Sequence, residues 1–176
     1  NTMDKLHEEL GVKFLGFHVE GFGGILATKE PTAPADPTVN KNLLLRVPPM
    51  DIFKVNADDL GYKTVSIAYA ELYSALQTGV AEGASGLPPV AVWNGYRDIT
   101  KFYYQYNNFF ENTSFIMNLD LWNSLSPEDQ KIIGDAVIDI SMHSFDISAE
   151  KDQEYRDKLA EAGVKVIEDI EEVASA

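Results

Sequence analysis

One arginine in this sequence stands where a charge is costly. Arg46 lies near the end of an apolar run, residues 43–47, which has the composition of a buried strand and is stopped by two prolines. A guanidinium group at the mouth of a buried strand costs free energy unless an anion satisfies it. That anion is either a ligand or a carboxylate of the chain, such as Glu71 or Glu82. The ligand makes the chain a receptor for an acid, whereas the internal salt bridge makes it a structural piece that binds nothing.

A second chemical candidate is Ser85, in the sequence Gly83-Ala84-Ser85-Gly86. A nucleophile elbow needs a glycine two residues after the serine, and position 87 is leucine, so the match to that motif fails. Glu82 can act as a general base only beside a second titratable group, and the sequence names no partner for it. A small serine-dependent hydrolase therefore stays an alternative without a motif, and we expect no catalytic residue.

The sequence contains no motif for binding a metal ion or a cofactor. The three histidines, His7, His18 and His143, are not spaced as metal ligands, and no HExxH motif is present. The absence of cysteine excludes disulfides, thiolate metal sites and cysteine nucleophiles. We therefore expect neither a metal ion nor a cofactor.

The charge balance argues against several classes of partner. The chain has 28 acidic and 14 basic residues among 176, which gives a formal net charge of −14. Binding to nucleic acid or to an anionic membrane surface needs a basic stripe, and the sequence has none. No run of 18 apolar residues exists, so we expect no membrane-spanning segment.

Hydrophobic periodicity, with glycine and proline between the segments, predicts alternating strands and helices. Strands are expected at residues 12–19, 25–28, 43–47, 63–67 and 164–167, with one or two more at 101–117. Helices are expected at residues 50–60, 69–76, 90–95, 119–124 and 127–162. Ser126 as N-cap, followed by Pro127 and Asp129, is a strong start signal for the last helix. The alternation predicts an α/β architecture with largely parallel strand pairing.

Aromatic side chains divide into core and site candidates. Tyr73 and most of the aromatic residues at 102–115 fit an apolar core. Tyr69 and Trp93 flank the segments nearest Arg46 in the expected topology, and a few aromatic residues with one cation are the usual composition of a small-ligand site. Arg46 and the Ser85-Gly86 pair follow predicted strands at their carboxyl ends, where ligands gather in open α/β sheets.

Three motifs resemble one family in their order and spacing. They are Leu45-Arg46-Val47-Pro48, residues 70–83 (AELYSALQTGVAEG) and residues 121–133 (LWNSLSPEDQKII). From about Leu10 onward the chain is similar to extracytoplasmic solute-binding proteins of the DctP type, which serve tripartite ATP-independent periplasmic (TRAP) transporters. The resemblance implies a two-lobed, periplasmic binding protein-like α/β fold with a cleft between the lobes. Such a protein binds a small organic acid in the periplasm, without catalysis, and delivers it to TRAP membrane subunits.

The resemblance also implies a set of ligand contacts. Arg46 occupies the position whose guanidinium pairs with the ligand carboxylate, a bidentate geometry that suits arginine better than lysine. Family members often have an asparagine in the segment that here reads Gly83-Ala84-Ser85-Gly86, and many have a second basic residue near Gly23-Gly24. Both are missing, so we expect room for a bulkier acid. The expected ligand-binding residues are Arg46, Ser85, Gly86, Trp93 and Tyr69.

The sequence begins like part of a longer chain. Residues 1–11 read as the tail of a helix closed by Gly11, and no signal-peptide pattern is present. By the resemblance, the N-terminal portion of the first lobe is missing. Residues 1–24 would then be the remainder of that lobe and a crossover, 25–115 the second lobe with the ligand anchor, and 116–176 a long hinge-spanning helix and a return to the first lobe. We expect exposed apolar surface on such a piece, through which it can associate with itself.

Overall fold

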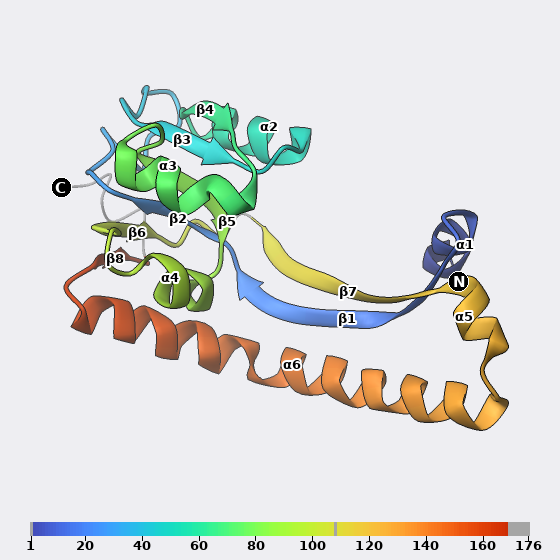
Figure 1. The fold of residues 1–176 in the computed structure, drawn as a ribbon. Coiled ribbons are helices and arrows are strands. Elements are labelled where there is room, and N and C mark those ends of the chain that lie inside the picture. The colour runs from blue at the N-terminus through green and yellow to red at the C-terminus, as the bar shows by residue number, and fades with distance from the viewer. Residues whose placement is uncertain (1, 108, 169–176) are drawn as a thin grey trace. The chain divides into compact units, whose positions relative to one another are not determined.

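The computed structural model describes residues 2–107 and 109–168, and its chain forms two compact units. Unit 1 consists of Asn1–Glu20 and Asn112–Ala149, and unit 2 consists of Gly21–Glu111 and Glu150–Ala176. Three elements contribute residues to both units, and Figure 1 labels them: β1 (Val12–Phe22), β7 (Phe110–Asn118) and α6 (Pro127–Glu161). Each unit is described by itself below.

Unit 1 is built on the pairing of β1 with β7. Its helices are α1 (Thr2–Glu9), α5 (Leu119–Ser124) and the first part of α6. Gly11 follows α1 with φ +72°, the left-handed conformation that glycine adopts most easily, so the predicted helix end is confirmed. At the start of α6, the backbone N–H of Asp129 donates to Ser126 Oγ at 3.1 Å, which confirms the predicted cap.

Unit 2 contains a six-stranded sheet with the order β4-β3-β5-β2-β6-β8. The strands are β2 (Gly24–Ala27), β3 (Leu44–Val47), β4 (Lys63–Ser66), β5 (Gly83–Leu87), β6 (Phe102–Tyr104) and β8 (Lys165–Ile167). The helices are α2 (Asp51–Asp59), the 3-10 helix η1 (Tyr69–Glu71), α3 (Leu72–Thr78), α4 (Pro89–Tyr96) and the last part of α6. All lie close to the predicted ranges except β5, a strand that the sequence ranges did not include.

The pairing within this sheet is mixed. β3 is parallel to both β4 and β5, and β6 is parallel to β8. β2 is antiparallel to both of its neighbours, β5 and β6. The expectation of largely parallel pairing missed this strand because a strand's direction depends on the path of the chain before it, which composition does not record.

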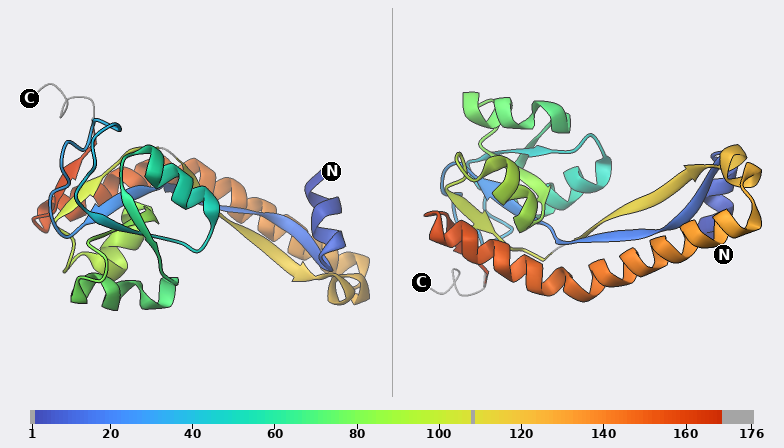
Figure 2. Two further views of the ribbon diagram at one scale, coloured as in Figure 1. Left: turned by 90° about the horizontal axis from the view of Figure 1, so that it is seen from above. Right: turned by 60° about the horizontal axis from the view of Figure 1, so that its bottom comes forward.

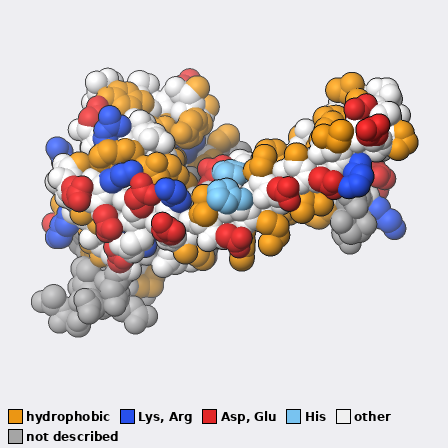
Figure 3. Space-filling model, turned by 90° about the horizontal axis from the view of Figure 1, so that it is seen from below, with side chains coloured by type: hydrophobic (Ala, Val, Ile, Leu, Met, Phe, Trp, Pro, Cys, Tyr) orange, Lys and Arg blue, Asp and Glu red, His pale blue; other side chains and the backbone are white. Residues whose placement is uncertain are grey.

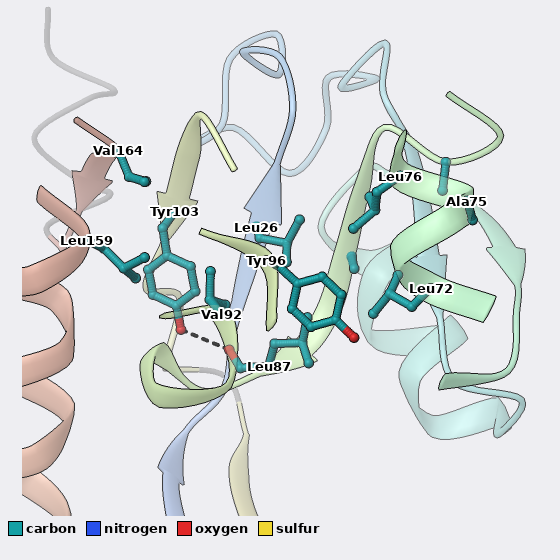
Figure 4. Close-up of a cluster of buried hydrophobic side chains, with 12 residues drawn as sticks. Leu26, Leu72, Ala75, Leu76, Leu87, Val92, Tyr96, Tyr103, Leu159 and Val164 are labelled. Atoms are coloured by element: carbon teal, nitrogen blue, oxygen red, sulfur yellow. Dashed lines mark hydrogen bonds between the residues drawn. The ribbon is translucent and has the colours of Figure 1, made fainter. Parts of the chain in front are cut away.

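Two clusters of buried side chains cover the two faces of the sheet. Cluster 1 lies on the face covered by α3, α4 and the end of α6, as Figure 4 shows. Its members are Leu26, Leu72, Ala75, Leu76, Ala81, Ala84, Leu87, Val92, Tyr96, Tyr103, Leu159 and Val164. Cluster 2 lies on the face covered by α2, and Figure 2 shows the sheet with helices on either side. Its members are Ile25, Ala27, Leu43, Leu45, Val47, Ala57, Tyr62, Tyr104 and Ile167.

Some side chains predicted to be core are exposed. Tyr73 was expected in the apolar stripe of its helix, but Leu72, Ala75 and Leu76 form the buried side of α3 instead. The Tyr73 hydroxyl donates to Asp98 at 2.6 Å. A tyrosine can turn its hydroxyl toward a polar partner at the surface while its ring stays against the protein.

The last strand lies in the sheet of unit 2. β8 pairs with β6 in the six-stranded sheet, which also contains the strand of Arg46, and residues from 150 onward belong to unit 2. The sequence interpretation describes residues 116–176 as a long helix and a return to the first lobe, which stays a prediction. The assignment of lobes at residues 24/25 and 115/116 itself stays a prediction. In the part of the chain that the structure describes, no helix has both the length and the apolar character that a membrane span requires.

Candidate functional site

Arg46 lies on β3 of unit 2, and its side chain is on the cluster 1 face of the sheet. Its neighbours along β3, Leu45 and Val47, belong to cluster 2, and successive side chains of a strand point to opposite faces. Across the sheet Arg46 is paired with Val65 and Ala84, which both contribute to cluster 1. Only 2% of its surface is exposed. The predicted buried strand with a charge near its end is therefore confirmed.

The Arg46 guanidinium has a backbone partner, the carbonyl oxygen of Ile67. Its Nε donates to the carbonyl oxygen of Ile67 at 2.8 Å. Among the described residues no carboxylate forms a salt bridge with it. Glu82, one of the two acids proposed as an internal partner, instead pairs with Lys29 at 2.6 Å and accepts from the backbone N–H of Leu44 at 2.9 Å. Burial lowers the pKa of Arg46 below its usual value, but arginine keeps its charge in proteins.

Two tyrosines interact electrostatically with this guanidinium. Tyr69 and Tyr96 are the two groups that counteract the effect of burial on the pKa of Arg46. Their rings meet nearly at right angles, with centroids 6.4 Å apart. Tyr69 is 60% exposed, whereas Tyr96, on α4, is 5% exposed and belongs to cluster 1. The sequence interpretation named Tyr69 and missed Tyr96, because nothing in the pattern of a short helix distinguishes one inward tyrosine from an ordinary core residue.

Ser85 is not brought together with Arg46. Because Ala84 points to the cluster 1 face, Ser85 points to the opposite face, where it is paired with Ile25 of cluster 2. Its buried Oγ has no hydrogen-bond partner among residues 2–107 and 109–168. A nucleophilic serine needs a base within hydrogen-bond reach. The hydrolase alternative therefore gains no support from the geometry.

Phenylalanine rings fill the space above the two glycine positions. Gly86 has φ +85°, and a Cβ there would lie 2.9 Å from Phe53 Cε1. A Cβ on Gly23 would lie 2.1 Å from the Phe109 ring. The two rings contact each other edge to face, with centroids 5.4 Å apart. The room expected at these glycines for a bulkier acid is therefore occupied, because aromatic side chains from elsewhere in unit 2 pack into it.

Trp93 is half-buried on α4, where it packs against cluster 1. The guanidinium carbon of Arg97 lies 5.1 Å from the centre of its ring, and Arg97 Nη1 donates to the Trp93 carbonyl oxygen at 2.7 Å. No described contact joins Trp93 to Arg46. It is therefore placed on the same face of the sheet as Arg46, in contact with a different arginine.

A hollow of about 310 Å³ opens at the carboxyl ends of β3 and β4. It is lined by Val47, Pro48, Pro49, Met50, Asp51, Lys54, Thr64 and Ser66. Arg46 does not line it, since its side chain points to the other face. In the described part of the chain no group of three or more histidine, aspartate or glutamate side chains is arranged to hold a metal ion.

Comparison with known proteins identifies the family. The DctP family model, described as bacterial extracellular solute-binding protein, family 7, matches residues 1–176. An uncharacterized protein of Haemophilus influenzae is 26% identical over 167 residues, which are 95% of this chain and 50% of that protein. The 2,3-diketo-L-gulonate-binding periplasmic protein YiaO of Escherichia coli is 28% identical over 173 residues, with the same two shares. The chain thus spans about half the length of these curated relatives.

Solved structures share the fold. A TRAP periplasmic solute-binding protein of Haemophilus influenzae with bound L-gulonate has a TM-score of 0.84 at 24% identity, covering 99% of this chain and 59% of that one. A TRAP periplasmic solute-binding protein of Chromohalobacter salexigens with bound D-glucuronate has a TM-score of 0.82 at 23% identity, covering 99% and 58%. The predicted α/β fold of this class is confirmed. The chain belongs to the DctP family of bacterial extracellular solute-binding proteins.

Proposed function

We propose that the protein containing this chain binds a small organic acid in the periplasm and delivers it to the membrane subunits of a TRAP transporter. Membership of the DctP family supports this role. One curated relative is named for binding a diketo acid, and the two solved relatives above hold sugar acids. The role is binding and delivery, without a chemical step.

The observation that carries the proposal is the state of Arg46. A buried cation without a carboxylate partner is costly, because an uncompensated buried charge destabilises the protein by several kcal/mol. Among the described residues only the Ile67 carbonyl oxygen is bound to its side chain, through Nε. The other guanidinium donors are therefore available to an acid. An arginine that binds a carboxylate through two parallel hydrogen bonds gives both charge compensation and orientation.

We assign the contacts in order of how directly the structure links each residue to this group. Arg46 binds the carboxylate, and Tyr69, which is exposed beside it, contacts the rest of the acid. Gly86, at the carboxyl end of the neighbouring strand β5, is a candidate for backbone contact. Trp93 shares the cluster 1 face and is a more distant candidate. Ser85, on the opposite face, is a candidate only through its backbone.

Calorimetric titration of the full-length protein with a panel of mono- and dicarboxylates tests the role. We expect at least one acid to bind, and Arg46→Ala to weaken it by about 2–5 kcal/mol, because the carboxylate then loses a buried partner. Arg46→Lys keeps the charge but loses the planar fork of the guanidinium. Its affinity for the acid should therefore lie between those of the wild type and Arg46→Ala. Arg97→Ala is the matched control, since it removes an exposed arginine of unit 2 that contacts Trp93.

Two results would contradict the proposal. One is the absence of binding by every acid of the panel. The other is an affinity that Arg46→Ala and Arg97→Ala change equally, while circular dichroism shows both variants folded.

A further inference from the structure

We propose that the tyrosine pair beside Arg46 selects acids that carry a hydroxyl or oxo group on the carbon next to the carboxylate. Tyr69 contacts that oxygen, and Tyr96 positions Tyr69. This inference rests on the proposed function, because it assigns the chemistry next to the carboxylate that Arg46 is proposed to bind.

The hydrogen bond to Ile67 limits how Arg46 can hold a carboxylate. A guanidinium offers two edges for a bidentate pair, one through Nε and one Nη and the other through both Nη atoms. Nε already donates to the Ile67 carbonyl oxygen at 2.8 Å. The carboxylate must therefore meet the edge formed by the two Nη atoms, at the far end of the side chain.

Tyr69 interacts electrostatically with the Arg46 guanidinium and follows its backbone partner closely in the chain. It lies in η1, two residues after Ile67, whose carbonyl oxygen accepts from the guanidinium. Its ring is exposed, so its hydroxyl can reach a ligand. A carboxylate paired with Arg46 has both oxygens engaged. The next polar group that a neighbouring hydroxyl can address is an oxygen on the adjacent carbon, toward which a tyrosine can either donate or accept.

Tyr96 gives Tyr69 a fixed partner. It is buried on α4 and meets the Tyr69 ring nearly at right angles, with centroids 6.4 Å apart. Tyr73 contacts the same Tyr96 ring, with centroids 6.3 Å apart, but its own hydroxyl donates to Asp98. The three rings therefore form one group, and Tyr69 and Tyr96 are its members that act electrostatically on the Arg46 guanidinium. Tyr73 is the matched control.

Matched acids that differ only next to the carboxylate test the inference. The probes are lactate, pyruvate and propionate; malate and succinate; mandelate and phenylacetate; and gluconate with its 2-deoxy analogue, each titrated into the full-length protein. We expect the oxygen-bearing member of the pair that binds to have an affinity about tenfold higher, the worth of one hydrogen bond to a ligand. Tyr69→Phe should bring that ratio close to one and leave the affinity for the other member unchanged. Tyr96→Phe should lower the ratio by a smaller factor, and Tyr73→Phe should preserve it.

The ratio separates specificity from stability, because a partly unfolded variant loses both acids of a pair alike. If acids bind through Arg46 but Tyr69→Phe leaves the ratio unchanged, the inference is overturned and the proposed function stands. If the tightest acid lacks the oxygen, the inference is likewise overturned. If no probe binds, the proposed function and this inference both fail. A ratio that falls with Tyr69→Phe and survives Tyr73→Phe supports the inference.

Discussion

The two units of this chain differ in how far they bury their apolar side chains. Within residues 2–107 and 109–168, every buried hydrophobic side chain belongs to unit 2, where the two clusters lie on either face of the sheet. Unit 1 instead has ten of the large hydrophobic side chains that are exposed. They are Leu6, Leu10, Phe17, Ile116, Leu121, Ile132, Ile138, Ile140, Met142 and Phe145. Figure 3 shows hydrophobic side chains interspersed with acidic ones on the surface of the molecule.

α6 carries this difference within one helix. Leu159, in unit 2, is 0% exposed and belongs to cluster 1, whereas Ile140, in unit 1, is 50% exposed. Ile132 and Ile140 belong to the hydrophobic periodicity from which the helix at residues 127–162 is predicted, and both are exposed. An amphipathic pattern predicts that a helix forms, but it does not name the element that covers its apolar face. Leu159 and Ile140 therefore show that a residue can lie in a predicted helix without its side chain being buried.

The largest expected effect comes from truncating one side chain of α6 in each unit. Leu159→Ala should lower the free energy of unfolding by about 2–5 kcal/mol, since it leaves a cavity in cluster 1. Ile140→Ala should change it by less than about 0.5 kcal/mol, because the side chain is already in contact with solvent. Urea unfolding of both variants, followed by circular dichroism, measures the difference. Equal losses in the two variants would mean that unit 1 buries Ile140 in solution, and the contrast between the units would not hold.

Most of the fold could be predicted from local signals. Helix starts and ends depend on side chains close in sequence, so Ser126, Pro127 and Gly11 marked them correctly. The direction of β2 and the exposure of Ile132 depend on which segments meet in space, and a single sequence does not record that. The same limit explains Tyr73, whose hydroxyl has its partner 25 residues away in Asp98.

The candidate site was predictable only in part. Arg46 could be found because a charge in an apolar run is unusual whatever the fold. Tyr96 could not, because a tyrosine on a short helix has no periodicity of its own and is placed beside Arg46 by the packing of α4. Ser85 was misplaced relative to Arg46 because the side to which a strand residue points depends on pairing register. The register became known only from the structure.

A smaller effect is expected from adding one methyl group at a tight position in each unit. A Cβ on Gly83 would lie 2.7 Å from the backbone oxygen of Leu26, which cannot move without disturbing the β2–β5 pairing. A Cβ on Gly16 would meet side-chain atoms only, Ser141 Oγ at 2.8 Å and Val137 Cγ1 at 2.9 Å. We expect Gly83→Ala to cost about 2–3 kcal/mol and Gly16→Ala about 1 kcal/mol.

Thermal and urea unfolding of these two alanine variants give the comparison, with the wild-type protein as reference. A larger loss for Gly16→Ala than for Gly83→Ala would show that the contacts of α6 with β1 in unit 1 are more rigid than the exposed side chains indicate.

The smallest effect concerns two contacts between β1 and α6, one in each unit. In unit 1 the Val19 N–H donates to Ser144 Oγ at 3.1 Å, and in unit 2 the Phe22 N–H donates to Asp152 Oδ2 at 2.8 Å. Burial raises the pKa of Asp152, although the Phe22 N–H and Arg156 act against it. With a folded-state pKa above its ordinary value, Asp152 retains its proton to higher pH in the folded protein than in the unfolded chain. Its contribution to stability therefore falls as pH rises through the folded-state pKa.

Asp152→Asn keeps an acceptor for Phe22 and removes this titration. We expect the free energy of unfolding of Asp152→Asn, relative to wild type, to increase as pH rises from about 4 to 7. Ser144→Ala should cost about 1 kcal/mol at every pH in that range, since a hydroxyl does not titrate there. Urea unfolding at a series of pH values measures both slopes. A flat difference for Asp152→Asn would show that the carboxylate is solvated in the folded protein, and that the tight packing of unit 2 does not extend to this contact.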